Sequence, residues 1–159
     1  IVKNSKQNIS EPHLTKDPAI YLLTDTGSMI HPIRHNGNHT VSFMLPPGIT
    51  TVRLISRANR PSDTIGPFIN DRRNLGVLVG KIIMLTTKSK ETIEAHLFEH
   101  ELSGWHDVEP GNFRWTNGNA ILPIRKIPTK EVSMINMQIV AAGPYLLENN
   151  IYAEYYKTA

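Results

Sequence analysis

Apolar and polar residues alternate along much of this chain with the two-residue period of a β-strand. The strongest run spans residues 75–85, LGVLVGKIIML, and its β-branched residues favour a strand at the centre of a sheet. Gly80 within this run indicates a bulge or a bend. Shorter runs bounded by turn-forming residues predict further strands at residues 19–23, 39–45, 51–55, 92–98, 113–116, 119–124 and 132–141.

Short strands separated by turn signals are typical of an all-β protein built from two packed sheets. The sequence therefore predicts a jelly-roll-like two-sheet sandwich of about eight strands with one long charged loop. Good helix formers at residues 91–102 leave a helix as the alternative to the strand at 92–98. Asn117-Gly118 predicts a hairpin that joins 113–116 to 119–124. The alternation at 132–141 slips once, which indicates an irregularity near Asn136.

The chain is long enough for one domain with its own core. Residues 1–18 are polar, contain Pro12 and Pro18 and lack a periodic apolar face, so they predict an N-terminal arm or linker. Residues 19–159 then form a single β-sandwich domain. The tail from Tyr145 onward carries several tyrosines and is a candidate edge strand.

The long loop between the strands at 51–55 and 75–85 concentrates charge. It contains four arginines and two aspartates: Arg57, Arg60, Asp63, Asp71, Arg72 and Arg73. Because the planar guanidinium pairs well with a carboxylate, we interpret the loop as an internally paired clamp on the sheet. The alternative is that one or two arginines hold an anionic ligand such as a uronate or a phosphate.

Composition excludes several classes of site. The chain has no cysteine, which excludes disulfides, thiolate nucleophiles and Cys-ligated zinc. Its formal charge of +3 comes from scattered Lys and Arg residues rather than a basic stripe, so we expect no nucleic-acid partner. No apolar run approaches the ~20 residues of a membrane span. We expect no cofactor, and an extracellular or cell-surface location rather than a cytoplasmic one.

Two groups of histidines suggest metal binding. His96, Glu99 and His100 fit the H-x-x-E-H pattern of inverted zinc proteases, which requires a helix to bring both histidines to one face. The alternation around His96 favours a strand, and Ser103-Gly104 would shorten any helix. His31, His35 and His39 recur every four residues, but Pro32 and Asn36-Gly37 argue against a helix there. We therefore predict no metal site, and a His-dependent metallohydrolase is our third hypothesis.

The segment from 105 to 119 is the best candidate for ligand binding. Sugar rings stack on aromatic side chains, while their hydroxyl groups bond to carboxylate, amide and guanidinium groups. The predicted binding residues are Trp105, His106, Asp107, Glu109, Arg114, Trp115 and Asn117, with Arg60 and Arg73 of the charged loop as further contributors. The alternative places at least one tryptophan in the core, where its large area stabilises the sandwich.

Two segments carry a family resemblance, LISRANRPSDTIGPFINDRRNLGV and, about thirty residues later, SGWHDVEPGNFRWTNGNA. The matching pieces are Ser56-Arg57, Arg60-Pro61, Asp63, Asp71-Arg72-Arg73, Leu75-Gly76-Val77, Gly104-Trp105, Glu109, Arg114-Trp115-Thr116, Gly118 and Ala120. Together they resemble a β-rich domain of bacterial proteins that carry Hint-type (Hedgehog/intein) domains and of exopolysaccharide-related glycosyltransferases. The resemblance implies a non-catalytic accessory module and supports a strand at 92–98.

These observations lead to one leading hypothesis and one main alternative. The leading hypothesis is a non-catalytic accessory module of a bacterial protein that binds or organises a carbohydrate, either an exopolysaccharide or a surface glycan. The alternative is a structural domain for protein interaction or oligomerisation, in which the charged loop and the tyrosine-rich tail contact a partner or a neighbouring domain.

Overall fold

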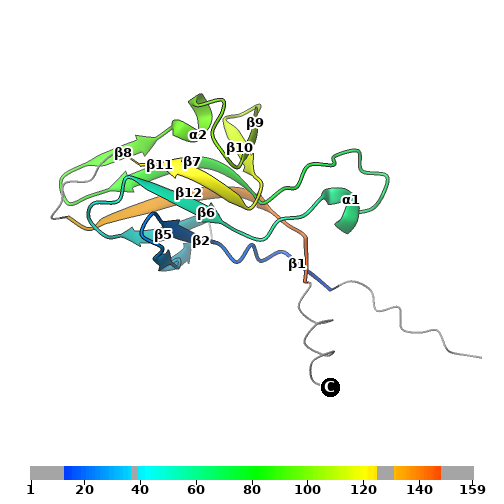
Figure 1. Ribbon diagram of the computed structural model, residues 1–159, viewed down its shortest axis with the longest axis horizontal. Coiled ribbons are helices and arrows are strands. Elements are labelled where there is room, and N and C mark those ends of the chain that lie inside the picture. Colours follow the sequence, from blue (N-terminus) through cyan, green and yellow to red (C-terminus); the bar gives the residue numbers. More distant parts are fainter. Residues whose placement is uncertain (1–12, 37–38, 125–130, 148–159) are drawn as a thin grey trace, which may run out of the picture.

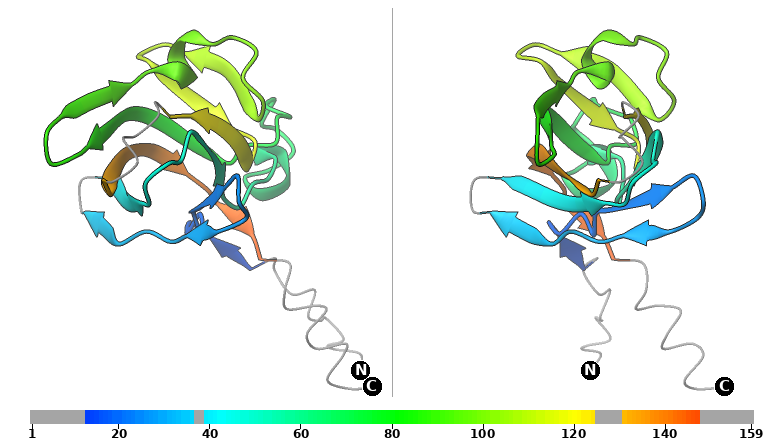
Figure 2. Two further views of the ribbon diagram at one scale, coloured as in Figure 1. Left: turned by 60° about the vertical axis from the view of Figure 1, so that its left-hand side comes forward. Right: turned by 90° about the vertical axis from the view of Figure 1, so that its left-hand side faces the viewer.

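The protein is an all-β sandwich. A computed structural model describes residues 13–36, 39–124 and 131–147, and these form one seven-stranded sheet, one four-stranded sheet and a separate two-stranded ribbon. The two large sheets face each other, and the loop that carries a short helix, α1, projects from one end (Figures 1 and 2). The predicted fold class is confirmed.

The seven-stranded sheet is antiparallel and is organised around its longest central strands. Its order is β4-β5-β12-β7-β10-β9, and β8 also pairs with β7. The first half of β7 pairs with β10 and the second half with β8, so β7 changes neighbour near Gly80. The strands are β4 (Arg34–Asn36), β5 (Thr40–Leu45), β7 (Val77–Leu85), β8 (Lys90–Ile93), β9 (Trp105–Glu109), β10 (Phe113–Thr116) and β12 (Ser133–Ala142).

The four-stranded sheet is also antiparallel, in the order β11-β6-β2-β3. Its strands are β2 (Tyr21–Thr24), β3 (Met29–Ile30), β6 (Thr51–Ile55) and β11 (Asn119–Pro123). The remaining ribbon pairs β1 (Leu14–Thr15) with β13 (Tyr145–Leu146). Leu14 and Thr15 of the predicted arm or linker are therefore paired with the start of the tail, while residues 1–12 and the tail tyrosines Tyr152, Tyr155 and Tyr156 lie outside the described residues.

Alternation along the strands produces the core. In β12, Ser133, Ile135, Met137 and Ile139 are buried, while the residues between them are partly exposed. Full burial of one such aliphatic side chain stabilises the fold by about 1.5–3 kcal/mol. Fully buried apolar side chains from both sheets meet in one cluster: Leu22, Phe43, Leu45, Leu54, Ile82, Leu122, Ile135 and Met137.

Both described helices are single turns. α1 (Pro61–Thr64) lies in the charged loop, and α2 (Ala95–Phe98) follows β8. Neither of these four-residue elements is long enough to cross a membrane. In the segment 92–98, β8 ends at Ile93 and α2 begins at Ala95. The predicted strand is therefore present in the first part of the segment, and the alternative, a helix, is present in the second part.

The predicted hairpin at Asn117-Gly118 is wrong. β10 belongs to the seven-stranded sheet and β11 to the four-stranded sheet, so this turn carries the chain from one sheet to the other. The carbonyl of Thr116 accepts the amide of Gly76 at 2.7 Å, whereas the carbonyl of Gly118 accepts the amide of Ser56 at 3.0 Å. Different neighbours on the two sides of the turn therefore override its local preference.

The predicted irregularities are present. The register between β12 and β7 shifts between Met137 and Ile139, next to Gly80. The side-chain oxygen of Gln138 accepts the amide of Lys81 at 3.1 Å and occupies the space that a Cβ at position 80 would need. The prediction of about eight strands was too low, because β1, β3, β4 and β13 are only two or three residues long and β9 lacks an alternating pattern.

Gly104 and Gly27 form a matched pair for testing the junction between the sheets. Both have positive φ, +86° and +88°, but a Cβ on Gly104 would lie 2.1 Å from the carbonyl oxygen of Asn119, whereas a Cβ on Gly27 meets nothing within 4 Å. We expect Gly27→Ala to cost about 1–2 kcal/mol from backbone strain alone. Gly104→Ala should cost at least about 3 kcal/mol, because the clash adds to that strain. Urea unfolding checks this, and equal losses would contradict it.

Candidate functional site

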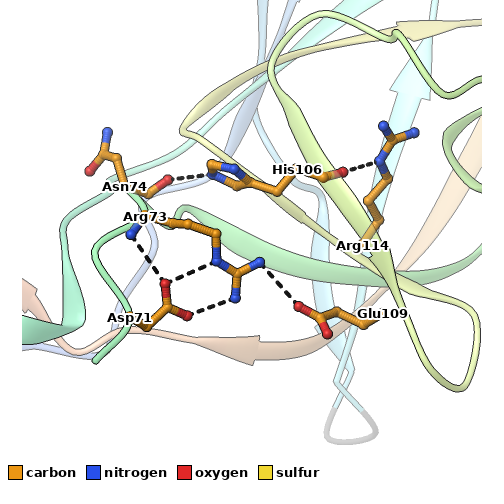
Figure 3. A network of polar contacts seen from close by, with 6 residues as sticks. All are labelled: Asp71, Arg73, Asn74, His106, Glu109 and Arg114. Carbon is orange, nitrogen blue, oxygen red and sulfur yellow. Dashed lines mark hydrogen bonds and ion pairs between the residues drawn. The ribbon is translucent and has the colours of Figure 1, made fainter. Parts of the chain in front are cut away.

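The charged loop is tied to the seven-stranded sheet by one arginine. The guanidinium of Arg73 donates to both carboxylate oxygens of Asp71, at 2.9 and 2.7 Å, and to Glu109 of β9 at 3.1 Å (Figure 3). The hydrogen bonds from Arg73 lower the pKa of Asp71 to about 2, and the bonds to Asp71 and Glu109 raise the pKa of Arg73. The predicted pairing of Asp71 is present, and Arg73 uses its donors within the protein.

Further contacts close the base of the loop. Asn59 and Leu75 form an isolated β-bridge with amide-to-carbonyl distances of 3.1 and 3.0 Å. The Nε2 atom of His106 lies 2.8 Å from the carbonyl oxygen of Asn74 (Figure 3). The loop therefore leaves and rejoins the sandwich at one fixed point.

Arg114 points into the sandwich. Its side chain is only 1% exposed and donates to the carbonyl oxygens of His96 and Glu99, at 3.0 and 2.7 Å, of His100 at 2.8 Å, and of His106. Burial lowers its pKa, because the charged guanidinium is removed from water. Within the described part of the chain it forms no ion pair, so main-chain carbonyl dipoles compensate its charge.

His96 and Trp105 complete this buried cluster. The ring centroids lie 5.4 Å apart, and the indole N–H of Trp105 donates to the carbonyl of Ile121 in the opposite sheet at 2.7 Å. Nε2 of His96 lies 2.7 Å from the carbonyl oxygen of Gly80, so Nε2 carries a proton. Nδ1 has no hydrogen-bond partner among the described residues, and burial lowers the pKa of this histidine.

The nine predicted binding residues do not form one surface. Trp105 and Arg114 are buried and hold the fold together, which leaves neither accessible to a ligand at the surface. Arg73, Glu109 and His106 are engaged with the charged loop. Asp107 and Asn117 are exposed, Trp115 is half-buried, and Arg60 lies in a separate cavity. Which ligand the chain binds stays a prediction.

That separate cavity lies beside α1 and has a volume of about 530 Å³. The side chains that line it include Arg57, Asn59, Arg60, Asp63 and Asn74, and Leu146 and Leu147 supply an apolar wall. Nη1 of Arg57 donates to the carbonyl of Asp17 at 2.8 Å, which positions this guanidinium. Arg60 is exposed, and its side chain forms no hydrogen bond or ion pair with any described residue, although its main-chain carbonyl accepts the amide of Asp63 at 2.9 Å.

Sequence reasoning identified Arg60 but missed the rest of this cavity. The spacing of Arg57, Arg60 and Asp63 was visible, since all three precede or begin α1. Leu146 and Leu147 are held beside the cavity by the side chain of Asn59. Its Nδ2 atom donates to the carbonyl of Pro144 at 2.8 Å, and its Oδ1 atom accepts the main-chain N–H of Leu146 at 2.7 Å. This contact joins residues more than eighty positions apart and has no local signal.

The H-x-x-E-H segment lacks the geometry of a zinc site. The helix ends at Phe98, before Glu99 and His100, and the Nε2 atom of His96 is occupied by the carbonyl of Gly80. Among the described residues, no three His, Asp or Glu side chains lie close enough together to hold a metal ion.

The smaller cavity of about 120 Å³ beside Trp115 is lined mainly by apolar side chains, including Ile65 and Tyr145.

Comparison of the chain with family models, with curated proteins and with solved structures found no match. The fold and the site are therefore described from this chain alone, and the resemblance to the accessory domains of Hint-type proteins stays a prediction.

Removal of the Arg114 guanidinium should destabilise the protein strongly. In Arg114→Met, four main-chain carbonyls lose their donor, the His96 carbonyl at a buried position and the other three at partly buried ones, so we expect a loss of about 3 kcal/mol of unfolding free energy. Arg53→Met is the control, because Arg53 is exposed and, among the described residues, its side chain donates to Asn119 alone, at 3.2 Å. It should change stability by less than about 0.5 kcal/mol. Urea unfolding of both variants measures the difference, and similar losses would refute the assignment.

The lowered pKa of His96 predicts a loss of stability in mild acid. Below pH 6.5, the ordinary pKa of histidine, His96 becomes protonated in the unfolded chain but stays neutral in the folded protein until a lower pH. The contribution of His96 to the unfolding free energy is therefore fully present above pH 6.5 and decreases as the pH is lowered. The contribution is at most about 1.4 kcal/mol per pH unit. His96→Gln should show a shallower decrease of unfolding free energy between pH 6.5 and 5 than the wild type. Parallel profiles would contradict this account.

Proposed function

We propose that this chain is a non-catalytic module that binds an acidic carbohydrate in the cavity beside α1. The observation that supports this best is the lining of the cavity, where Arg57 and Arg60 stand with amide and carboxylate side chains around an apolar wall. Its volume of about 530 Å³ lies within the roughly 300–1,000 Å³ that is usual for small-ligand sites.

Each part of the lining has a partner in the chemistry of a uronic acid. A guanidinium binds a carboxylate through two parallel hydrogen bonds, which a neutral sugar does not offer. Asp63 and Asn74 suit hydroxyl groups, which donate and accept. Leu146 and Leu147 offer an apolar surface to the C–H face of a sugar ring.

The charged loop then has two functions that fall on different residues. Arg73 and Asp71 fix the loop to β9, and their pairing leaves them few donors or acceptors for a ligand. Arg60 keeps its guanidinium available within the described structure. This division agrees with the accessory role that the family resemblance implies, and it moves the proposed site away from the tryptophans.

Arg60→Ala should weaken the binding of tetragalacturonate. We expect a loss of tenfold or more in affinity, because a charged hydrogen bond contributes about 1.5–3 kcal/mol. Arg72→Ala is the matched control: Arg72 is an exposed arginine of the same loop that does not line the cavity, and its removal should change the affinity less than twofold. Isothermal titration calorimetry measures both, with the methyl-esterified tetrasaccharide as the uncharged probe. Absence of binding by the wild type, or equal losses in both variants, would refute the proposal.

Asp71→Ala separates positioning from binding. The variant loses the partner of Arg73 and should be less stable by about 1 kcal/mol, a modest value because both side chains are about one-third exposed. Under conditions where it remains folded, its affinity for tetragalacturonate should match that of the wild type. A stable variant with impaired binding would place Asp71 in the site instead.

A further inference from the structure

The middle of the charged loop is an apolar tip, residues 65–69, with the sequence IGPFI. Phe68 is 97% exposed, Ile65 59% and Ile69 38%. In Figure 1 the loop around α1 extends from the end of the molecule opposite the β7–β8 turn, and Ile65 also lines the small cavity beside Trp115. Single exposed apolar residues are common, but three of them at the end of one projecting loop indicate a contact surface.

The backbone holds this tip in shape. Pro61 and Pro67 restrict the chain on both sides of Ile65. The amide of Ile65 bonds to the carbonyl of Pro61 at 2.8 Å, and that of Ile69 to the carbonyl of Gly66 at 3.2 Å. Because the base of the loop is also fixed through Arg73, little conformational entropy remains to be lost when the tip binds.

Positive charge flanks the tip. Arg60 precedes it and Arg72 follows it, both side chains are exposed, and neither forms an ion pair with a described residue. Of the two aspartates in residues 60–73, Asp71 is neutralised by Arg73, which leaves Asp63 against the two flanking arginines. The tip is thus an apolar projection with a net positive surround.

We propose that this tip inserts into the interface of an anionic lipid bilayer. A bilayer buries a convex apolar projection from all sides without a preformed pocket, and aromatic and aliphatic side chains settle at the boundary between headgroups and acyl chains. Arginines beside the inserted residues pair with headgroup phosphates, and each basic residue near an anionic surface strengthens the attraction. The contact is peripheral and shares Arg60 with the carbohydrate cavity, whereas Phe68 and Arg72 belong to the tip surface and do not line that cavity.

Co-sedimentation with vesicles tests this inference. The wild type should bind vesicles of phosphatidylcholine and phosphatidylglycerol at 3:1 more strongly than vesicles of pure phosphatidylcholine. Phe68→Ser should reduce the bound fraction at least fivefold. Phe98→Ser is the control, because Phe98 is 69% exposed but lies on α2, and it should bind like the wild type.

Other outcomes would overturn the proposal. These are no sedimentation with anionic vesicles, equal losses in both phenylalanine variants, or a solution dimer that Phe68→Ser converts to monomers, which would assign the tip to a second copy of the chain. Arg72→Ala should weaken vesicle binding while leaving tetragalacturonate binding intact, and Phe68→Ser should also keep the saccharide affinity. Failure of one proposal is therefore distinguishable from failure of the other.

Discussion

The guanidinium of Arg114 lies inside the sandwich and donates to main-chain carbonyls of α2, of the two residues after it and of β9. Three of these carbonyls belong to the connection between β8 and the edge strand β9, and the fourth, that of His106, belongs to β9 itself. A four-residue helix cannot satisfy its own terminal carbonyls, so without this donor the buried carbonyl of His96 would lose its partner. The course of the chain from β8 to β9 therefore depends on one side chain of β10.

The same region joins the two sheets. The indole of Trp105 donates to Ile121 of β11, and the amide of Ile121 donates to the carbonyl of Ser103 at 2.9 Å, so the outer edge of β11 is covered. An edge satisfied in this way does not offer its backbone to another strand. Trp105, which suggested a stacking surface for a sugar, instead connects the two sheets of the sandwich. Recognition must then come from elements that the core does not use.

Alternation predicted most strands because burial on one face leaves a period of two, and 51–55 coincides with β6. Alternation did not predict which face of a strand points into the core when the buried residues of that strand are polar. In β10, Phe113 and Trp115 face outward while Arg114 and Thr116 are buried, the reverse of the apolar-inside rule. Contacts with residues distant in the sequence decide which side chains of β10 point inward, and they also decide the sheet to which β11 belongs. The lining of the cavity beside α1 depends in the same way on the pairing of β1 with β13.

The arrangement of the charged loop links the two proposed surfaces. Asp63 of the cavity and Ile65 of the apolar tip are two residues apart, so their Cα atoms are separated by at most about 7 Å. Because Arg73 and the Asn59–Leu75 bridge fix the base of the loop, the tip and the cavity keep one relative position. A tip inserted at a lipid interface would hold the cavity close to the headgroups. The saccharides within its reach would then be those carried near the membrane surface rather than those free in solution.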